Sequence, residues 1–244
     1  MSLKEDIQNK AKEIRDTIFA KKPTSSVPSI DTPALTFGGT GLTFPATVLY
    51  IDMRGSTKLL NTHQRRVTAK IHMIYYHTIC KIAKQDGGEI RSFNGDSLLV
   101  FFYGNSVDVT QNAVRSAFRI RFAITDIINK TLTEYTNIDF GIGIDYGEIL
   151  ATKVGLGGNS DNKDLIWIGN AVNRSTKISD ECCDPYYVGI SASVYGRLED
   201  SLIHYKEQNV YGYDQVCDVW NQSRLEYNDD YEIFYKSSCQ IEIS

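Results

Sequence analysis

The stretch TVLYIDMRGST at residues 47–57, taken with EIRSFNGDSLLVFFY at residues 89–103, decides the fold of this chain. The first segment is an apolar run of strand length that ends at Asp52 and continues into turn residues and a helical pattern. The second has an Asn-Gly pair between two apolar runs, which is the typical sequence of a hairpin turn. Together they predict strand, helix and hairpin in succession, with Asp52 and Asp96 at strand ends.

The region before these segments has a different composition. Apolar residues repeat every three or four positions along residues 3–20, which predicts an amphipathic helix. Residues 23–45 are rich in Pro, Ser, Thr and Gly, which indicates a linker or an irregular loop. We therefore expect an N-terminal helix and linker at residues 1–45 and one folded domain at residues 46–244.

Within that domain, strand and helix patterns alternate. One long helix is expected from the RGST turn to about residue 85, and a second at residues 107–130. Strand 138–145 is expected to turn at Tyr146-Gly147 into residues 148–155 as a second hairpin. The remaining expected segments are a Gly-rich loop at 155–163, strands at 165–169, 186–190, 202–205, 216–220 and 231–235, and helices at 170–180 and 192–198. This order predicts an α+β sandwich with a mixed central β-sheet and flanking helices.

Composition excludes several classes of protein. The formal net charge of −4 and the lack of a basic cluster argue against nucleic-acid binding. No apolar run is long enough to cross a membrane, and the polar N-terminus does not resemble a signal peptide, so we expect a cytoplasmic protein. The five cysteines lack CxxC spacing, and His72 and His77 are five residues apart, which does not suit a shared ligand face.

Asp52 and Asp96 are the residues of the opening segments that carry chemistry. A carboxylate at the end of a buried strand is costly unless it is paired, exposed or bound to a cation. Two carboxylates at adjacent strand ends could hold magnesium ions that bridge triphosphate oxygens, as two-metal sites do for in-line attack at phosphorus. The alternative is that each aspartate caps a turn, which is common after a strand or an Asn-Gly pair.

Four motifs stand in order along the chain, and each resembles a motif of the class III nucleotide cyclases. They are YIDMRGST at 50–57, EIRSFNGDSLLVFF at 89–102, GIGIDYGEILATKVG at 141–155 and IWIGNAVNRSTKIS at 166–179. The resemblance covers about residues 46–200 and implies a sandwich with a ferredoxin-like core. It implies conversion of a nucleoside triphosphate to a 3′,5′-cyclic monophosphate and pyrophosphate. The glycines miss the dinucleotide-binding spacing, and no Walker sequence is present.

The resemblance also implies roles for individual residues. It implies two divalent cations, Mg²⁺ or Mn²⁺, held by Asp52, Asp96 and the main-chain carbonyl of Met53. Asn173 would position the ribose, and Lys177 would stand where the family has an arginine that stabilises charge at phosphorus. The polyphosphate would be held at a helix N-terminus by the backbone amides of Arg54, Gly55, Ser56 and Thr57.

Two residues, Lys177 and Glu148, depart from the family pattern. Lys177 offers a point charge where an arginine would offer a fork for two phosphate oxygens. Arg174 is a competing candidate for the phosphate role, because it directly follows Asn173. Glu148 stands where the family often has a phosphate-binding arginine. These departures keep open a second hypothesis, in which the chain is a degenerate cyclase fold that binds nucleotide as a regulator.

The positions that select the purine base in the family hold Ser92 and Ile166 here, which match neither the adenine nor the guanine pattern. Tyr50 and Arg91 are the neighbouring candidates for base recognition. A pocket narrowed by a tyrosine and offering arginine donors suits a pyrimidine with carbonyl acceptors. The chain thus resembles the bacterial antiphage pyrimidine cyclases, which implies UTP as substrate and cyclic UMP as product. The alternatives are that Tyr50 is a core residue and Arg91 an exposed one, and that the chain makes cyclic AMP.

The resemblance finally implies a partner. Class III cyclases work as head-to-tail homodimers with shared active sites, in which one subunit supplies the metal aspartates and the other supplies the helix with Asn173. Neither subunit would then form a complete site alone. The N-terminal helix either strengthens such a dimer or packs on its own domain.

Overall fold

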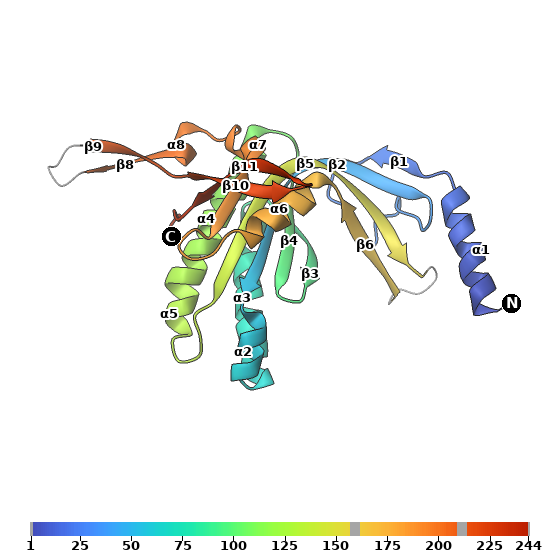
Figure 1. Cartoon of the computed structure of the whole chain (residues 1–244), viewed down its shortest axis with the longest axis horizontal. Helices are drawn as coiled ribbons and strands as arrows, with labels where there is room; N and C mark the ends of the chain where they lie inside the picture. Colours follow the sequence, from blue (N-terminus) through green and yellow to red (C-terminus); the bar gives the residue numbers. More distant parts are fainter. Residues whose placement is uncertain (1, 157–161, 209–213, 244) are drawn as a thin grey trace. The chain divides into compact units, whose positions relative to one another are not determined.

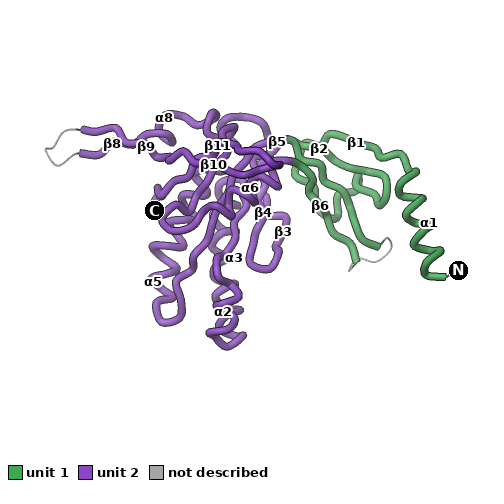
Figure 2. The backbone as a smooth tube through the Cα atoms, viewed as in Figure 1, with its two compact units in different colours: residues 1–44, 148–169 green, residues 45–147, 170–244 purple. Residues whose placement is uncertain are grey.

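The computed structural model describes residues 2–156, 162–208 and 214–243 (Figure 1). The chain divides into two compact units (Figure 2): unit 1 is Met1–Phe44 with Glu148–Gly169, and unit 2 is Pro45–Gly147 with Asn170–Ser244. The predicted Gly-rich loop at 155–163 lies largely outside the described residues. Segment 148–169 therefore groups with the N-terminal region and not with the residues on either side of it.

Unit 2 is built on a mixed sheet. Its strands follow the order β10-β11-β7-β5-β2-β4-β3. Pairing is parallel between β5 and β7, and antiparallel in the pairs β2–β4, β3–β4, β7–β11 and β10–β11. The strands are β2 (Thr40–Arg54), β3 (Glu89–Asn94), β4 (Ser97–Tyr103), β5 (Asp139–Gly155), β7 (Val188–Ser191), β10 (Asn221–Tyr227) and β11 (Asp230–Ser237). The order β5-β2-β4-β3 confirms the ferredoxin-like core and the α+β class.

Alternation along β2 sorts its side chains onto the two faces of the sheet. Leu49, Ile51 and Met53 are buried in the main core, with apolar residues of α3 (Arg65–Gln85) and α4 (Val107–Phe122). Because successive side chains of a strand point to opposite faces, Asp52 and Arg54 belong to the other face. The period of two thus separates the core side of the sheet from the side that carries the candidate chemistry.

The helices depart from the predicted lengths in two places. The expected long helix after Arg54 is two helices, α2 (Ser56–Thr62) and α3, because the backbone of His63, which caps the end of α2, is extended. The expected helix at 107–130 is continuous in outline but changes type. It runs through α4, a π-helical segment (Ala123–Ile128) and α5 (Asn129–Thr131).

The predicted hairpin at Tyr146-Gly147 is wrong, because β5 continues through this position to Gly155. The glycines of this strand serve close packing against α6 (Asn170–Asp180). A Cβ on Gly143 would lie 1.9 Å from the Ser175 carbonyl oxygen, and one on Gly147 would lie 3.3 Å from the Ala171 Cβ. The helix α6 itself has the predicted bounds.

Unit 1 contains α1 (Leu3–Asp16), β1 (Ala20–Pro23), the start of β2, the end of β5, and β6 (Lys163–Ile168). The predicted helix at 3–20 ends early, because the C-cap Thr17 is extended and Ala20 already pairs with Thr40. The expected linker contains the first residues of β2, which starts at Thr40. β6 pairs with β5 from Gly155 back to Leu150, so the second hairpin exists but turns later than predicted.

The C-terminal region adds smaller elements to unit 2. They are α7 (Ala192–Tyr195), α8 (Asp200–Ile203), β8 (His204–Gln208) and β9 (Asp214–Asp218), and β8 and β9 form a separate two-stranded sheet. Strand β10 was not expected from the sequence, because NQSRLEY has few apolar residues. No helix in the described ranges is both long and apolar enough to span a membrane.

Candidate active site

Asp52 and Asp96 come together at one end of the unit 2 sheet. Asp52 is the residue of β2 that pairs with Ser97, the first residue of β4, and Asp96 directly precedes Ser97 in the β3–β4 turn. Gly95 makes this turn possible, since its φ of +65° lies in the left-handed region. The two carboxylates therefore sit on neighbouring strands, as the sequence predicted.

The charges of the two aspartates repel each other. The pKa of Asp52 is raised by partial burial of the carboxyl group and next by the charge of Asp96, while Arg54 lowers it. A divalent cation between the carboxylates would remove that repulsion, and carboxylate oxygens are the ligands that Mg²⁺ and Mn²⁺ prefer. Across the described residues, no group of three or more Asp, Glu, His or Cys could hold a metal ion. The two-aspartate set therefore fits a cation that takes its other ligands from backbone, water and phosphate.

Two adjacent tyrosines of α3, Tyr75 and Tyr76, lie near the aspartate pair. The Tyr76 hydroxyl donates to the Gly95 carbonyl at 2.7 Å, which fixes the turn that carries Asp96. Tyr75 is fully buried, and its hydroxyl has no hydrogen-bond partner within the described structure. Burial, followed by the charge of Asp52, raises its pKa well above the ordinary value, so it stays protonated. Tyr50 is half-buried, and burial likewise raises its pKa.

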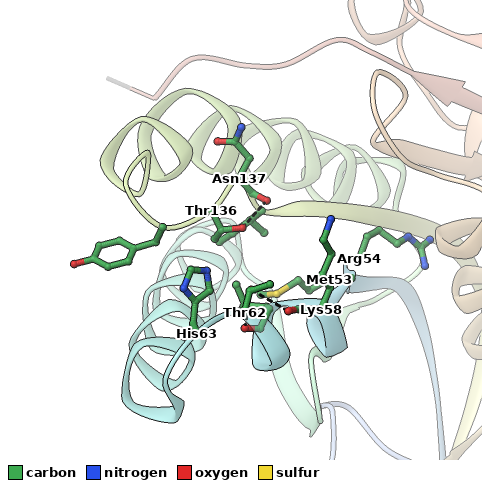
Figure 3. A pocket seen from close by; sticks show the side chains of 11 residues that line it. Met53, Arg54, Lys58, Thr62, His63, Thr136 and Asn137 are labelled. Atoms are coloured by element: carbon green, nitrogen blue, oxygen red, sulfur yellow. Dashed lines mark hydrogen bonds between the residues drawn. The ribbon is translucent and has the colours of Figure 1, made fainter.

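A cavity of about 360 Å³ opens beside the end of β2 (Figure 3). Residues of α2 line one side and the segment before β5 lines the other, with Lys58 extending between them in Figure 3. Its lining contains basic groups but no carboxylate: Met53, Arg54, Gly55, Lys58, Leu59, Thr62, His63, Tyr135, Thr136, Asn137 and Ile138. In a chain of net charge −4, this composition favours an anion.

The predicted phosphate segment borders this cavity. Gly55 caps α2 with a φ of +68° and, being a glycine, provides no side-chain cap for the first-turn amides of α2. Ser56 and Thr57 are the first residues of the helix. The guanidinium of Arg54 is directed away from the cavity in Figure 3, so this residue would offer an anion its backbone amide.

Asn173 and Lys177 are exposed on α6 and line a second, wider cavity of about 850 Å³. The turn between β10 and β11 lines the same cavity through Asn228 and Asp229, both at positive φ. The sequence did not show whether the tail beyond Leu202 adds to a pocket. The structure brings this turn to the residues predicted for ribose and phosphate.

Arg174 does not share the exposure of its neighbours. Its guanidinium contacts Asp145 Oδ2 at 2.8 Å and Glu232 Oε2 at 2.7 Å, and it lies over the Tyr227 ring. The Asp145 side chain is fully buried and also accepts from the Ser193 hydroxyl. Arg174 therefore ties α6 to β5 and β11, and its guanidinium nitrogens are already bonded to carboxylates, which leaves it less available to a phosphate than Lys177.

The predicted base residues have different surroundings. Arg91 is the extra residue of a β-bulge in β3, and its guanidinium bonds to Glu89 at 3.0 Å and to the Ile90 carbonyl. Ser92 follows it in unit 2 and is half-buried, whereas Ile166 lies on β6 in unit 1. Arg91 is thus partly occupied by protein groups.

Sequence reasoning missed some residues of the site. Asp145 was visible as a charge that directly follows the apolar run FGIGI of β5, which was a usable signal for a buried ion pair. Lys58 and the Arg54 side chain gave no such signal, because both look like ordinary surface residues in the sequence. Glu148, where a phosphate-binding arginine was expected, forms an exposed ion pair with Lys21 at 2.8 Å within unit 1.

Comparisons with known proteins agree with this geometry. A "Uridylate cyclase" of Burkholderia cepacia is 31% identical over 206 residues, covering 83% of this chain and 87% of that protein. A second "Uridylate cyclase", of Rhodovulum sp. (strain MB263), is 30% identical over 98% of this chain and 97% of that protein. The crystal structure of the guanylyl cyclase Cya2 shares the fold, with a TM-score of 0.64, 19% identity and coverage of 82% of this chain and 94% of that one.

The family model described as the adenylate and guanylate cyclase catalytic domain matches residues 43–216, which is well over half of the chain. The matched region contains the aspartate pair, the cavity beside α2, and the exposed residues of α6. This chain therefore belongs to the adenylate and guanylate cyclase catalytic domain family, the class III nucleotide cyclases.

Proposed function

We propose that this class III cyclase is a uridylate cyclase, which converts UTP to 3′,5′-cyclic UMP and pyrophosphate. The observation that carries the proposal is the similarity, over almost the whole chain, to the two proteins that bear this name. The departure of Ser92 and Ile166 from the purine-selecting residues of the family supports it.

In the proposed reaction the ribose 3′-oxygen attacks the α-phosphorus, the 3′-hydroxyl proton is released, and pyrophosphate leaves. Asp52, Asp96 and the Met53 carbonyl would hold two divalent cations, which would lower the pKa of the 3′-hydroxyl and neutralise charge on the phosphates. Asn173 would orient the ribose by hydrogen bonding. The Lys177 ammonium would stabilise the negative charge that develops at phosphorus.

The polyphosphate lies at the start of α2 in this proposal. Gly55 gives α2 no side-chain cap, so the backbone amides of residues 54–57, at the end of β2 and the start of α2, could donate to phosphate oxygens. The cavity with Lys58 and His63 extends from this turn and would take the terminal phosphates. Lys58 would thus supply a positive charge for the phosphates, which Glu148 cannot do at the position where the family often has an arginine.

Tyr50 and Ser92 are the proposed contacts for uracil. Tyr50 is on the same face of β2 as Asp52, and its protonated hydroxyl can donate to a base carbonyl. Ser92 is small and can donate or accept a hydrogen bond. Arg91 can contribute only in so far as its bonds with Glu89 and the Ile90 carbonyl permit.

The proposed active enzyme is a head-to-tail homodimer in which α6 of one subunit faces the aspartates of the other. The exposure of Asn173 and Lys177 over a wide cavity supports such a shared site. Nucleoside triphosphates and reduced thiols both occur in the cytosol, which is the location we propose, with antiphage signalling as the role. All five cysteines are unpaired, in agreement with that location.

The test is to incubate the purified chain with UTP, CTP, ATP and GTP separately, with Mn²⁺, and to identify the cyclic products by mass spectrometry. We expect cyclic UMP to dominate and the Asp52→Ala chain to be at least about a hundredfold slower. Dominant cyclic AMP would overturn the choice of base. Binding of nucleotide without turnover of any of the four would overturn the enzyme proposal in favour of a regulator.

A further inference from the structure

The side chain of Arg54 joins the end of strand β2 to the end of helix α6. Its Nη2 donates to the main-chain carbonyls of Ser179 and of Cys182, the latter at 3.2 Å. Its Nη1 lies 3.7 Å from Asp180 Oδ1. A guanidinium is suited to such a position, because it can bind several oxygens at once and complements the negative end of the helix dipole.

The surrounding residues leave room for this contact. A Cβ on Gly141 would lie 2.8 Å from Arg54 Nη2 and 2.3 Å from the Ser179 carbonyl oxygen, so only glycine fits there. Ser179 is itself fully buried, and its hydroxyl donates to the Gly141 carbonyl at 2.8 Å. The last turn of α6 is thus fixed at one place on β5 and by one side chain from β2.

The contact of Arg54 with Asp52 is weaker. Its Nη1 lies 3.5 Å from Asp52 Oδ2, which is at the limit of a hydrogen bond, and both side chains remain about a quarter exposed (25% and 22%). If Asp52 also binds a metal ion, the metal neutralises its charge, and the attraction of Asp52 to the distant Arg54 guanidinium becomes weaker. The closer bonds of Arg54 go to the main-chain carbonyls of Ser179, in the last turn of α6, and of Cys182, just after it.

We propose that Arg54 is a positioning residue for α6 and acts on the active site that this helix completes, not on the site of its neighbour Asp52. The inference rests on the proposed shared-site dimer, in which Asn173 and Lys177 of one subunit serve the aspartates of the other. In that arrangement, the end of β2 in one subunit supplies Asp52 to one active site. Through Arg54, the same end of β2 also holds α6, which supplies Asn173 and Lys177 to the second active site. Arg54 therefore couples the two sites through a single subunit.

Mixed dimers separate the two possible effects. A dimer of an Asp52→Ala chain and an Asn173→Ala chain has one complete site, built from Asp52 of the second chain and α6 of the first. Arg54→Met can be placed in either chain, and it leaves the backbone amide in place. We expect it to lower kcat at least about tenfold when placed in the Asp52→Ala chain, which supplies α6. In the Asn173→Ala chain, which supplies Asp52, we expect a clearly smaller loss of kcat, because only the distant contact of Arg54 with Asp52 is removed there.

The reverse pattern, with the loss confined to the Asn173→Ala chain, would overturn the proposal. So would equal losses in both placements, because they would indicate a general effect on folding. The half-saturating Mn²⁺ concentration provides a second readout and should stay unchanged when Arg54→Met is on the α6-supplying chain. Arg65→Met, at an exposed arginine that starts α3, is the matched control and should change neither quantity.

Hydrogen exchange of the full-length Arg54→Met chain tests the inference independently of catalysis. Amides of residues 178–183 should exchange at least about tenfold faster, because the end of α6 loses its anchor. Arg54→Lys should restore little protection, since an ammonium cannot span both carbonyls. If the two parent chains fail to complement, the shared-site dimer is wrong, and the exchange result alone decides the anchoring. Unchanged exchange at residues 178–183 would refute it.

Discussion

Arg174 and Lys177 lie about one turn apart on α6, yet their surroundings give them opposite roles. Arg174→Met would leave the buried Asp145 carboxylate without its cation, and breaking a buried pair in this way costs about 3–5 kcal/mol. We expect a loss of this size in the free energy of unfolding, measured by urea denaturation. Lys177→Met is the matched change at an exposed position, and it should reduce kcat while altering stability by less than about 0.5 kcal/mol.

A second variant separates the effect of charge from the effect of packing at the Arg174–Asp145 ion pair. Adding Asp145→Asn to Arg174→Met removes the unpaired buried charge, so part of the lost stability should return. Asp145→Asn alone gives the cost of that single substitution in the free energy of unfolding. If adding Asp145→Asn to Arg174→Met lowers the free energy of unfolding by that same amount, the two effects are additive, and loss of the ion pair is not the source of the effect. Equal destabilisation by Lys177→Met would likewise contradict the structural role of Arg174.

Lys58 is the residue whose role follows from the cavity and not from the family motifs. Lys58→Ala should raise KM for the triphosphate about tenfold and weaken inhibition by pyrophosphate by a similar factor, because one charge-assisted bond to phosphate is lost. The value of kcat should change much less. Lys81→Ala, at an exposed lysine of α3, provides the control. Unchanged pyrophosphate inhibition would show that the terminal phosphates lie elsewhere.

At the level of elements, the packing of α6 on β5 depends on glycine. A Cβ at Gly143 would overlap the backbone of Ser175, whereas a Cβ at Gly147 would only press on the Ala171 side chain. Gly143→Ala should therefore destabilise the fold by about 1–3 kcal/mol or more, and Gly147→Ala clearly less. Thermal unfolding of the two variants checks this order. Equal unfolding temperatures would mean that α6 can move off the strand without cost.

The same elements show what the sequence could and could not predict. The β3–β4 hairpin and α6 were predicted closely, because an Asn-Gly turn and an apolar helical face are local signals. The turn at Tyr146-Gly147 was predicted wrongly, because a glycine that permits a turn and one that permits close packing look the same in a sequence. The break between α2 and α3 comes from the extended backbone of His63, which the helical periodicity on either side does not reveal.

At the scale of the whole molecule, some contacts of the site could be predicted from the sequence and others could not. The meeting of Asp52 and Asp96 could be inferred from motif order, because both lie at ends of strands in one small supersecondary unit. The contacts of Arg54 with α6 and of Arg174 with Glu232 join segments far apart in the chain. Such contacts depend on the packed tertiary structure, which one sequence does not specify residue by residue.

A shared site makes a quantitative prediction for mixtures of whole chains. A chain with both Asp52→Ala and Asn173→Ala lacks the residue that it should supply to each of the two shared sites. Every dimer that it forms with the wild-type chain is therefore inactive. A tenfold excess should therefore reduce wild-type activity to about a tenth, if subunits exchange freely. An equal excess of Asp52→Ala alone should leave the activity per wild-type chain almost unchanged, because each mixed dimer keeps one complete site. If both mixtures behave alike after verified exchange, each subunit contains its own complete site, and the dimer has another purpose.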